Sequence, residues 1–130
     1  MNASIEIHDS EVQLAEGENG TFRLFFSAGY VHESEGRPGL DAGTGYLQPA
    51  ELVFGEASWS EPVTEGIGRL SGGWVSINGE KLSLVPLPFS ASGEISAEFI
   101  FASGAAISVS ASSVECISRG KARFVENYVG

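Results

Sequence analysis

The chain has 130 residues, of which 42% are hydrophobic and 18% are charged. Its 17 acidic and 7 basic residues give a formal net charge of −10 at pH 7. This length and composition predict one globular domain over residues 1–130 and exclude a disordered chain. Because a field of this sign repels phosphate backbones and anionic lipid surfaces, we expect neither a nucleic-acid partner nor a membrane partner.

The first residues and the single cysteine favour a cytoplasmic location. Residues 1–7 contain neither a positively charged segment nor a long apolar one, so we expect no signal peptide. No run approaches the roughly 18 apolar residues of a membrane-spanning helix. Cys116 is the only cysteine, which excludes an internal disulfide, and we expect it to be a small buried hydrophobic residue.

Apolar and polar residues alternate with period two through most of the chain, which is typical of strands with one solvated face. We find no segment with convincing helical periodicity. In chain order, single strands are expected over residues 4–8, 11–15, 20–31, 46–59, 113–117 and 122–128.

Turn chemistry predicts a first hairpin at Asn78-Gly79, a pair that favours the positive φ angles of a two-residue type I′ turn. The resulting register pairs Ile77 with Glu80, Val75 with Leu82, and Gly73 with Leu84. Trp74 then lies on the face opposite to Val75 and Ile77.

A second hairpin is expected around Gly104. A three-residue loop, Ala102-Ser103-Gly104, places Gly104 in a left-handed bulge position and keeps every acidic residue off the core face. Its register pairs Phe99 with Ile107, Ala97 with Val109, and Ile95 with Ala111.

Together these elements predict a single all-β domain, an antiparallel β-sandwich or flattened barrel of about eight or nine strands with largely meander connections. Such an open sheet leaves edge strands. A homodimer through a paired edge strand or through the Trp74 face is therefore a further expectation.

Residues 32–46 form the longest polar connection, with four glycines among 15 residues. Hairpin loops usually have about 2–5 residues, and longer ones are often functional. We therefore predict that this loop forms one wall of a binding surface, with Tyr46 and Trp74 as contacts. The alternative is that the loop is scaffolding between two strands. The candidate binding residues are His32, Glu33, Arg37, Asp41, Tyr46 and Trp74.

Catalytic and cofactor motifs are not recognisable in this loop. No spacing matches a zinc signature or an EF-hand. Gly43-Thr44-Gly45 precedes a strand rather than the helix that a phosphate loop requires, and no Gly-x-Ser-x-Gly nucleophile motif occurs. The sequence thus predicts no catalytic residue, no metal and no cofactor.

A non-enzymatic cytoplasmic binding or protein-interaction module is the function that these observations favour, with another protein or a small polar ligand as its partner. One alternative is a metalloprotein or hydrolase-like enzyme centred on His32, Glu33 and Asp41 in the 32–46 loop, joined by His8 or Asp9. A second alternative is an acidic inhibitor or immunity-like protein, whose charge would steer it to a basic target.

Several motifs resemble those of a family of small bacterial all-β proteins, a domain of unknown function. They are Tyr30-Val31-His32, Gly36-x-Pro38-Gly39-x-Asp41-x-Gly43-Thr44-Gly45-Tyr46-x-Gln48, Pro86-Leu87-Pro88 and Arg123-Phe124-Val125-Glu126. The resemblance implies a bacterial source and a stand-alone domain. It implies no activity and no functional residues.

Overall fold

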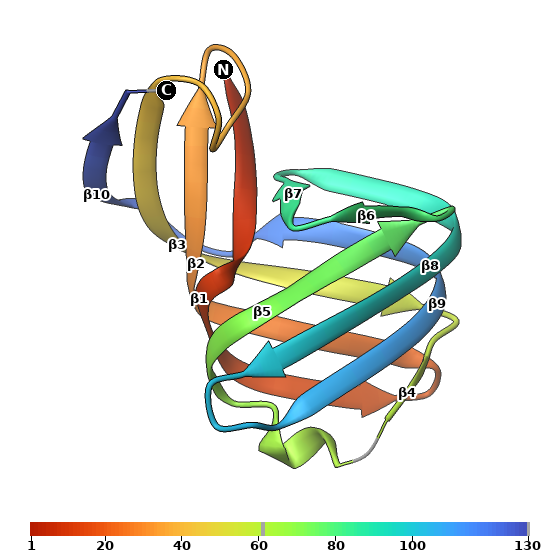
Figure 1. The fold of residues 1–130 in the computed structure, drawn as a ribbon. Helices are drawn as coiled ribbons and strands as arrows, with labels where there is room; N and C mark the ends of the chain where they lie inside the picture. Colours follow the sequence, from red (N-terminus) through yellow and green to blue (C-terminus); the bar gives the residue numbers. More distant parts are fainter. Residues whose placement is uncertain (61, 130) are drawn as a thin grey trace.

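The computed structural model describes residues 1–60 and 62–129, and its regular structure within these residues is ten strands and one 3₁₀ turn (Figure 1). No helix in this part of the chain is long and apolar enough to cross a membrane. The elements are β1 (Asn2–Glu18), β2 (Thr21–Ser34), β3 (Gly43–Gly55), β4 (Ser58–Trp59), η1 (Val63–Glu65), β5 (Gly68–Ile77), β6 (Glu80–Leu82), β7 (Leu84–Pro86), β8 (Phe89–Phe101), β9 (Ala106–Ser118) and β10 (Arg123–Tyr128).

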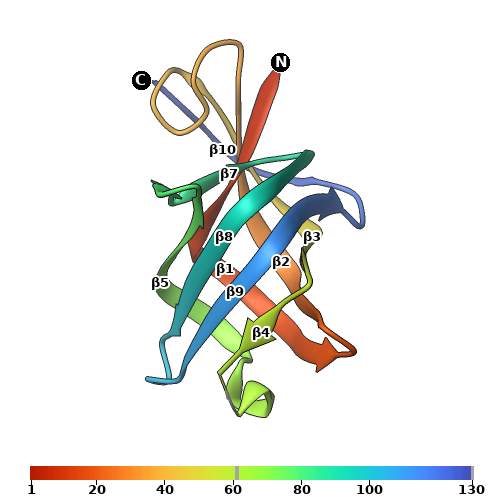
Figure 2. The same ribbon diagram turned by 90° about the vertical axis from the view of Figure 1, so that its right-hand side faces the viewer.

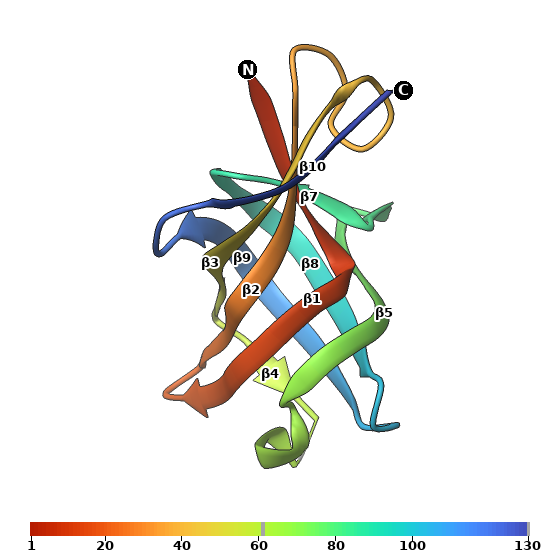
Figure 3. The same ribbon diagram turned by 90° about the vertical axis from the view of Figure 1, so that its left-hand side faces the viewer.

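Six strands form a closed ring in the order β1-β2-β3-β9-β8-β5, and β5 returns to pair with β1. All of these pairs are antiparallel. Closure depends on two long-range contacts: β3 pairs with β9 from Ala50 to Gly55, and Glu11 and Val12 of β1 pair with Arg69 and Gly68 of β5. Seen from the two sides, β8 and β9 cross the opposing β1 and β2 around a common interior (Figures 2 and 3).

The first three strands continue beyond the ring and form a second sheet that stands above it (Figure 1). In this extension sheet β10 pairs with β3 at one edge, and β7 pairs with β1 at the other. The extension sheet consists of residues 2–8 of β1, 28–34 of β2, 43–48 of β3, β7 and β10.

A pair of irregularities separates the ring from the extension sheet. The β1–β2 register moves from Glu6↔Tyr30 to Glu11↔Ala28, and the β2–β3 register shifts between Phe26 and Gly29. Asp9 lies within the first interruption and has a φ of 71°. Because a bulge bends its strand and increases the local twist, these shifts let the same strands serve both sheets.

The ring interior is filled by aromatic and branched apolar side chains. Five phenylalanines are fully buried, and Trp59 of β4 packs on Phe22 with ring centroids 5.8 Å apart. Each such side chain contributes about 1.5–3 kcal/mol of burial free energy. The largest fully buried residues are Phe22, Phe26, Phe54, Phe99, Phe101, Ile5, Ile7, Leu24, Leu52, Leu70, Ile95 and Ile107.

The register predictions from turn chemistry are confirmed over most of their length. The second hairpin has its three predicted pairs, and Gly104 has a φ of 97°. The Asn78-Gly79 hairpin has the first two of its predicted pairs. The third predicted pair is wrong, because Leu84 pairs with Glu6 of β1 and not with Gly73. The pairing of β6 with β5 ends at Leu82, and the chain then crosses to the extension sheet.

The all-β class is confirmed, while several strand boundaries differ. Residues 4–8 and 11–15 belong to one bulged strand, and residues 46–59 divide into β3 and β4. The described part of the chain has ten strands instead of eight or nine, because β6 and β7 are separate short strands. The meander holds for β1-β2-β3, whereas ring closure adds pairs between strands far apart in sequence.

Candidate functional site

Polar side chains from three strands gather on one face of the extension sheet. Alternation along β2 puts Tyr30 and His32 on this face, and alternation along β10 does the same for Glu126 and Tyr128. Glu6 joins them because it lies opposite Tyr30 in the β1–β2 register. We call these five residues the polar cluster.

His32 occupies the centre of the polar cluster, and its side chain is only 12% exposed. Its Nε2 lies 2.6 Å from Glu6 Oε1, and its Nδ1 lies 2.5 Å from Tyr128 Oη. A neutral ring with its proton on Nε2 satisfies both contacts, donating to the carboxylate and accepting from the phenol. The histidine therefore joins β1 to β10 through side chains alone.

Tyr30 makes the second link to β10. Its Oη lies 2.5 Å from Glu126 Oε1, which it reaches by crossing β3 above Gly45. A Cβ at Gly45 would lie 2.6 Å from Tyr30 Oη. The missing side chain at Gly45 is thus what allows the tyrosine ring to span the strand.

The two tyrosines of the polar cluster hold their protons more tightly than free tyrosine. Burial raises the pKa of Tyr30 far above its usual value, and its hydrogen bond to the Glu126 carboxylate raises it further. Burial also raises the pKa of Tyr128, against the opposing effect of a hydrogen bond with the Gly39 backbone. Both phenols remain neutral at physiological pH.

Raised tyrosine pKa values make stability fall in alkaline solution. Unfolded tyrosine loses its proton near pH 10, whereas folded Tyr30 keeps it, so above that pH the folded state binds more protons. We expect the free energy of unfolding to be constant below about pH 9 on this account and to decrease as pH rises above about 10. Urea unfolding across this range measures the slope.

Two substitutions check the source of this slope. Tyr30→Phe removes the titrating group, and Glu126→Gln removes the charge that the phenolate would meet. Both variants should therefore lose less stability between about pH 9 and 11 than the wild-type protein. Equal slopes in all three proteins would show that Tyr30 does not carry the effect.

The predicted 32–46 loop is shorter in the structure, because residues 32–34 belong to β2 and residues 43–46 to β3. The connection of residues 35–42 folds back toward the polar cluster and is held by hydrogen bonds of its own and of the adjoining strand ends. Ser34 Oγ donates to the Ala42 carbonyl at 2.8 Å. Arg37 donates its backbone amide to Asp41 Oδ2 at 2.7 Å and its guanidinium to both carboxylate oxygens. A Cβ at Gly39 would lie 2.9 Å from Leu84 Cδ1 and 3.7 Å from His32 Cγ. The loop tip therefore lies against the histidine.

Of the six predicted binding residues, His32 alone belongs to the polar cluster. Arg37 and Asp41 pair with each other in the loop. Glu33 and Tyr46 belong to the opposite face of the extension sheet, where Tyr46 packs against Phe124. Trp74 lies on β5, and Lys81 Nζ lies over its ring at 4.3 Å from the ring centroid. A binding role for these residues outside the cluster stays a prediction.

Sequence reasoning missed Glu6, Tyr30, Glu126 and Tyr128. The spacing of Tyr30 and His32, and of Glu126 and Tyr128, indicates that each pair shares a face. It does not indicate that the two pairs meet, since 96 residues separate Tyr30 from Glu126.

An open pocket of about 280 Å³ lies beside the polar cluster. It is lined by Glu6, Asp9, Tyr30, His32 and Glu126. Three of the five are carboxylates. Asp9 Oδ1 is contacted at 2.8 Å by Arg69 Nη2 of β5.

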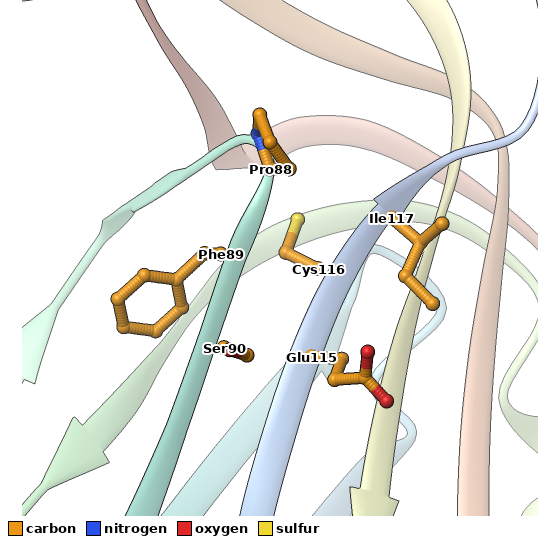
Figure 4. A pocket seen from close by; sticks show the side chains of 6 residues that line it. All are labelled: Pro88, Phe89, Ser90, Glu115, Cys116 and Ile117. Carbon is orange, nitrogen blue, oxygen red and sulfur yellow. The ribbon is translucent and has the colours of Figure 1, made fainter.

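A second hollow, of about 460 Å³, lies where β8 and β9 pair outside the extension sheet (Figure 4). Cys116 borders it but is only 1% exposed, which confirms the predicted buried cysteine. Burial raises the pKa of the Cys116 thiol to about 12, so it stays protonated and unreactive. This hollow has no converging set of titratable groups and is the weaker candidate.

The edge strand β10 is relevant to the expected homodimer. Among the described strands it pairs with β3 alone, and Phe124 and Val125 on it are 53% and 43% exposed. The homodimer itself stays a prediction.

Comparison with known proteins gives no relative: no family model, curated protein or solved structure matches the chain. The resemblance to a bacterial family also stays a prediction, and function must be argued from the site.

Proposed function

We propose that the protein is a non-enzymatic binding module that takes a small polar ligand carrying positive charge in the pocket beside the polar cluster. The proposal rests on the convergence of three carboxylates at one pocket of about 280 Å³. Glu6 and Asp9 come from β1, and Glu126 comes from β10.

Charge supports a cationic ligand. Glu126 accepts a hydrogen bond from the neutral Tyr30 hydroxyl, and the cationic Arg69 contacts the lining at Asp9. The net charge of −10 adds a long-range field of the same sign, which raises the local concentration of cations. Tyr30 is half-buried and lines the pocket, so its ring adds an aromatic group to which a cation is attracted.

The state of the polar cluster supports binding over catalysis. Glu6, His32 and Tyr128 form a carboxylate–imidazole–hydroxyl chain of the kind that activates nucleophiles. An activated phenol needs a lowered pKa, whereas burial raises that of Tyr128. Tyr128 is also held by the Gly39 backbone and lies 3.5 Å from the Thr44 carbonyl. This hydrogen-bonded series of three side chains therefore serves to position Glu6 and β10.

Thermal unfolding with matched small molecules tests this function. We expect 1,4-diaminobutane to raise the melting temperature of the full chain, and the neutral 1,4-butanediol and anionic succinate of similar length to leave it unchanged. At ten times its Kd a ligand that binds only the folded state stabilises it by about 1.4 kcal/mol, a shift of a few degrees.

Two charge-matched variants assign the effect to the pocket. Glu126→Gln should reduce the shift caused by the diamine at least severalfold. Glu80→Gln changes the net charge equally in the exposed Asn78-Gly79 hairpin and should retain the shift. Absence of a shift with the diamine, or an equal shift in both variants, would contradict the proposed pocket.

A further inference from the structure

A second group of metal-ligating side chains lies at the β1 rim of the pocket. Glu6, His8 and Asp9 each place one ligand atom within 4.8 Å of the other two. His8 Nδ1 lies 3.6 Å from Glu6 Oε2 and 3.3 Å from Asp9 Oδ2. These residues offer one imidazole nitrogen and two carboxylate oxygens from four consecutive positions of one strand.

The β1 bulge produces this convergence. In a regular strand, consecutive side chains point to opposite faces, so Asp9 would point away from His8. The register jump after Glu6 and the φ of 71° at Asp9 interrupt that alternation and bring the Asp9 carboxylate to the same side. Bulges are used in this way to redirect side chains next to functional sites.

Each of the two carboxylates has its other oxygen held by a donor from a neighbouring strand. Glu6 Oε1 accepts from His32 Nε2 on β2 at 2.6 Å, and Asp9 Oδ1 accepts from Arg69 Nη2 on β5 at 2.8 Å. Metal-ligating carboxylates are typically hydrogen-bonded by outer partners in this manner, which fixes their orientation. The oxygens that remain, Glu6 Oε2 and Asp9 Oδ2, are the two that lie near His8.

The distances fit the edges of a coordination polyhedron better than hydrogen bonds. Nitrogen and oxygen ligands lie about 2.0–2.2 Å from Zn²⁺, which separates neighbouring ligand atoms of a tetrahedral site by roughly 3.3–3.6 Å. The distances from His8 Nδ1 to the two oxygens are 3.3 and 3.6 Å. Both exceed the usual N–H···O range of about 2.7–3.2 Å.

We propose that Glu6 Oε2, His8 Nδ1 and Asp9 Oδ2 bind a divalent transition-metal cation of the Zn²⁺ class at the rim of the pocket. His8 and Asp9 are 52% and 43% exposed, so the remaining coordination position is open to water or a ligand. The site goes beyond the organic-cation pocket: it shares Glu6 and Asp9 with the pocket lining and adds His8. The proposal departs from the sequence-based expectation of no metal, which relied on spacing motifs, and it uses His8 and Asp9, which the metalloprotein alternative had placed beside His32.

Calorimetric titration of the full, tag-free chain with ZnCl₂, after removal of metals with a chelator, tests this site. We expect one Zn²⁺ per chain in the wild-type protein. His8→Ala and Asp9→Asn should each weaken binding at least tenfold, and neither exposed change should unfold the ring. Asp41→Asn removes the same charge from the Arg37 pair in the loop and should bind Zn²⁺ as tightly as wild type.

Imidazole NMR resonances give an independent measurement, since the chain has two histidines. Zn²⁺ should shift the His8 resonances strongly, with smaller changes at His32. Weak binding that is equal in wild type and His8→Ala would be adventitious and would overturn the proposal. So would the absence of binding, in which case His8 is simply an ion-pair partner of Glu6 and Asp9.

This outcome is separable from the fate of the proposed function. Diamine binding that depends on Glu126, without stoichiometric Zn²⁺ binding, would retain the pocket and remove the metal. Stoichiometric Zn²⁺ binding that depends on His8, without diamine binding, would do the reverse.

Discussion

Gly73→Ala is expected to lower the free energy of unfolding by at least about 2 kcal/mol, whereas the adjacent Gly72→Ala should change it by no more than about 1 kcal/mol. Gly73 has a φ of 149°, and a Cβ there would lie 2.5 Å from the Glu98 carbonyl oxygen and 3.0 Å from Ile7 Cγ2. A backbone strain of about 1–3 kcal/mol and an overpacking cost of similar size act together. A Cβ at Gly72 meets nothing within 4 Å.

Urea unfolding followed by tryptophan fluorescence measures both variants under identical conditions. The comparison is sharp because the two glycines are consecutive in β5, so composition and strand propensity are matched. Gly72→Ala should even stabilise slightly, since alanine restricts the unfolded chain. Equal midpoints for the two variants would show that β5 can move away from β8 at Gly73↔Phe99, and that this part of the ring is not tightly packed.

Local chemistry made part of this fold predictable. The register of β8 with β9 follows from a three-residue loop with a left-handed glycine, which is information carried by consecutive residues. Ring closure is different in kind. The pairs between β3 and β9, and between β1 and β5, join segments far apart in the chain. An alternating pattern predicts a strand but does not indicate which other strand it pairs with. The sequence therefore predicted the class and the hairpins but not the closed ring.

The bulge in β1 explains why the site was only partly predicted. Alternation breaks down around residues 8–10, which led to the expectation of two strands where one bulged strand exists. That irregularity is also what gathers Glu6, His8 and Asp9. The 32–46 loop was recognisable by its length and polarity, yet its charged residues Arg37 and Asp41 satisfy each other. His32 was found because it belongs to that long polar segment, although it lies at the end of β2, and its partners from β1 and β10 required the fold.

Ser10→Ala is expected to lower the free energy of unfolding by about 1–3 kcal/mol, the cost of leaving buried polar groups without partners. Ser10 is completely buried where the β1–β2 ladder is interrupted. Its Oγ donates to the Glu6 carbonyl at 2.5 Å and accepts from the Tyr30 backbone amide at 2.9 Å. One hydroxyl therefore replaces ladder hydrogen bonds that the bulge removes.

Hydrogen exchange distinguishes this local role from a general loss of packing. In Ser10→Ala the Tyr30 amide should exchange faster than the decrease in global stability accounts for, because its acceptor is gone. Ser112→Ala, at an exposed serine of β9, should leave both the midpoint and the Tyr30 amide unchanged. A protected Tyr30 amide in Ser10→Ala would mean that another acceptor replaces the hydroxyl. Since Glu6 and Tyr30 both belong to the polar cluster, loosening at Ser10 should reach the candidate site before it reaches the ring.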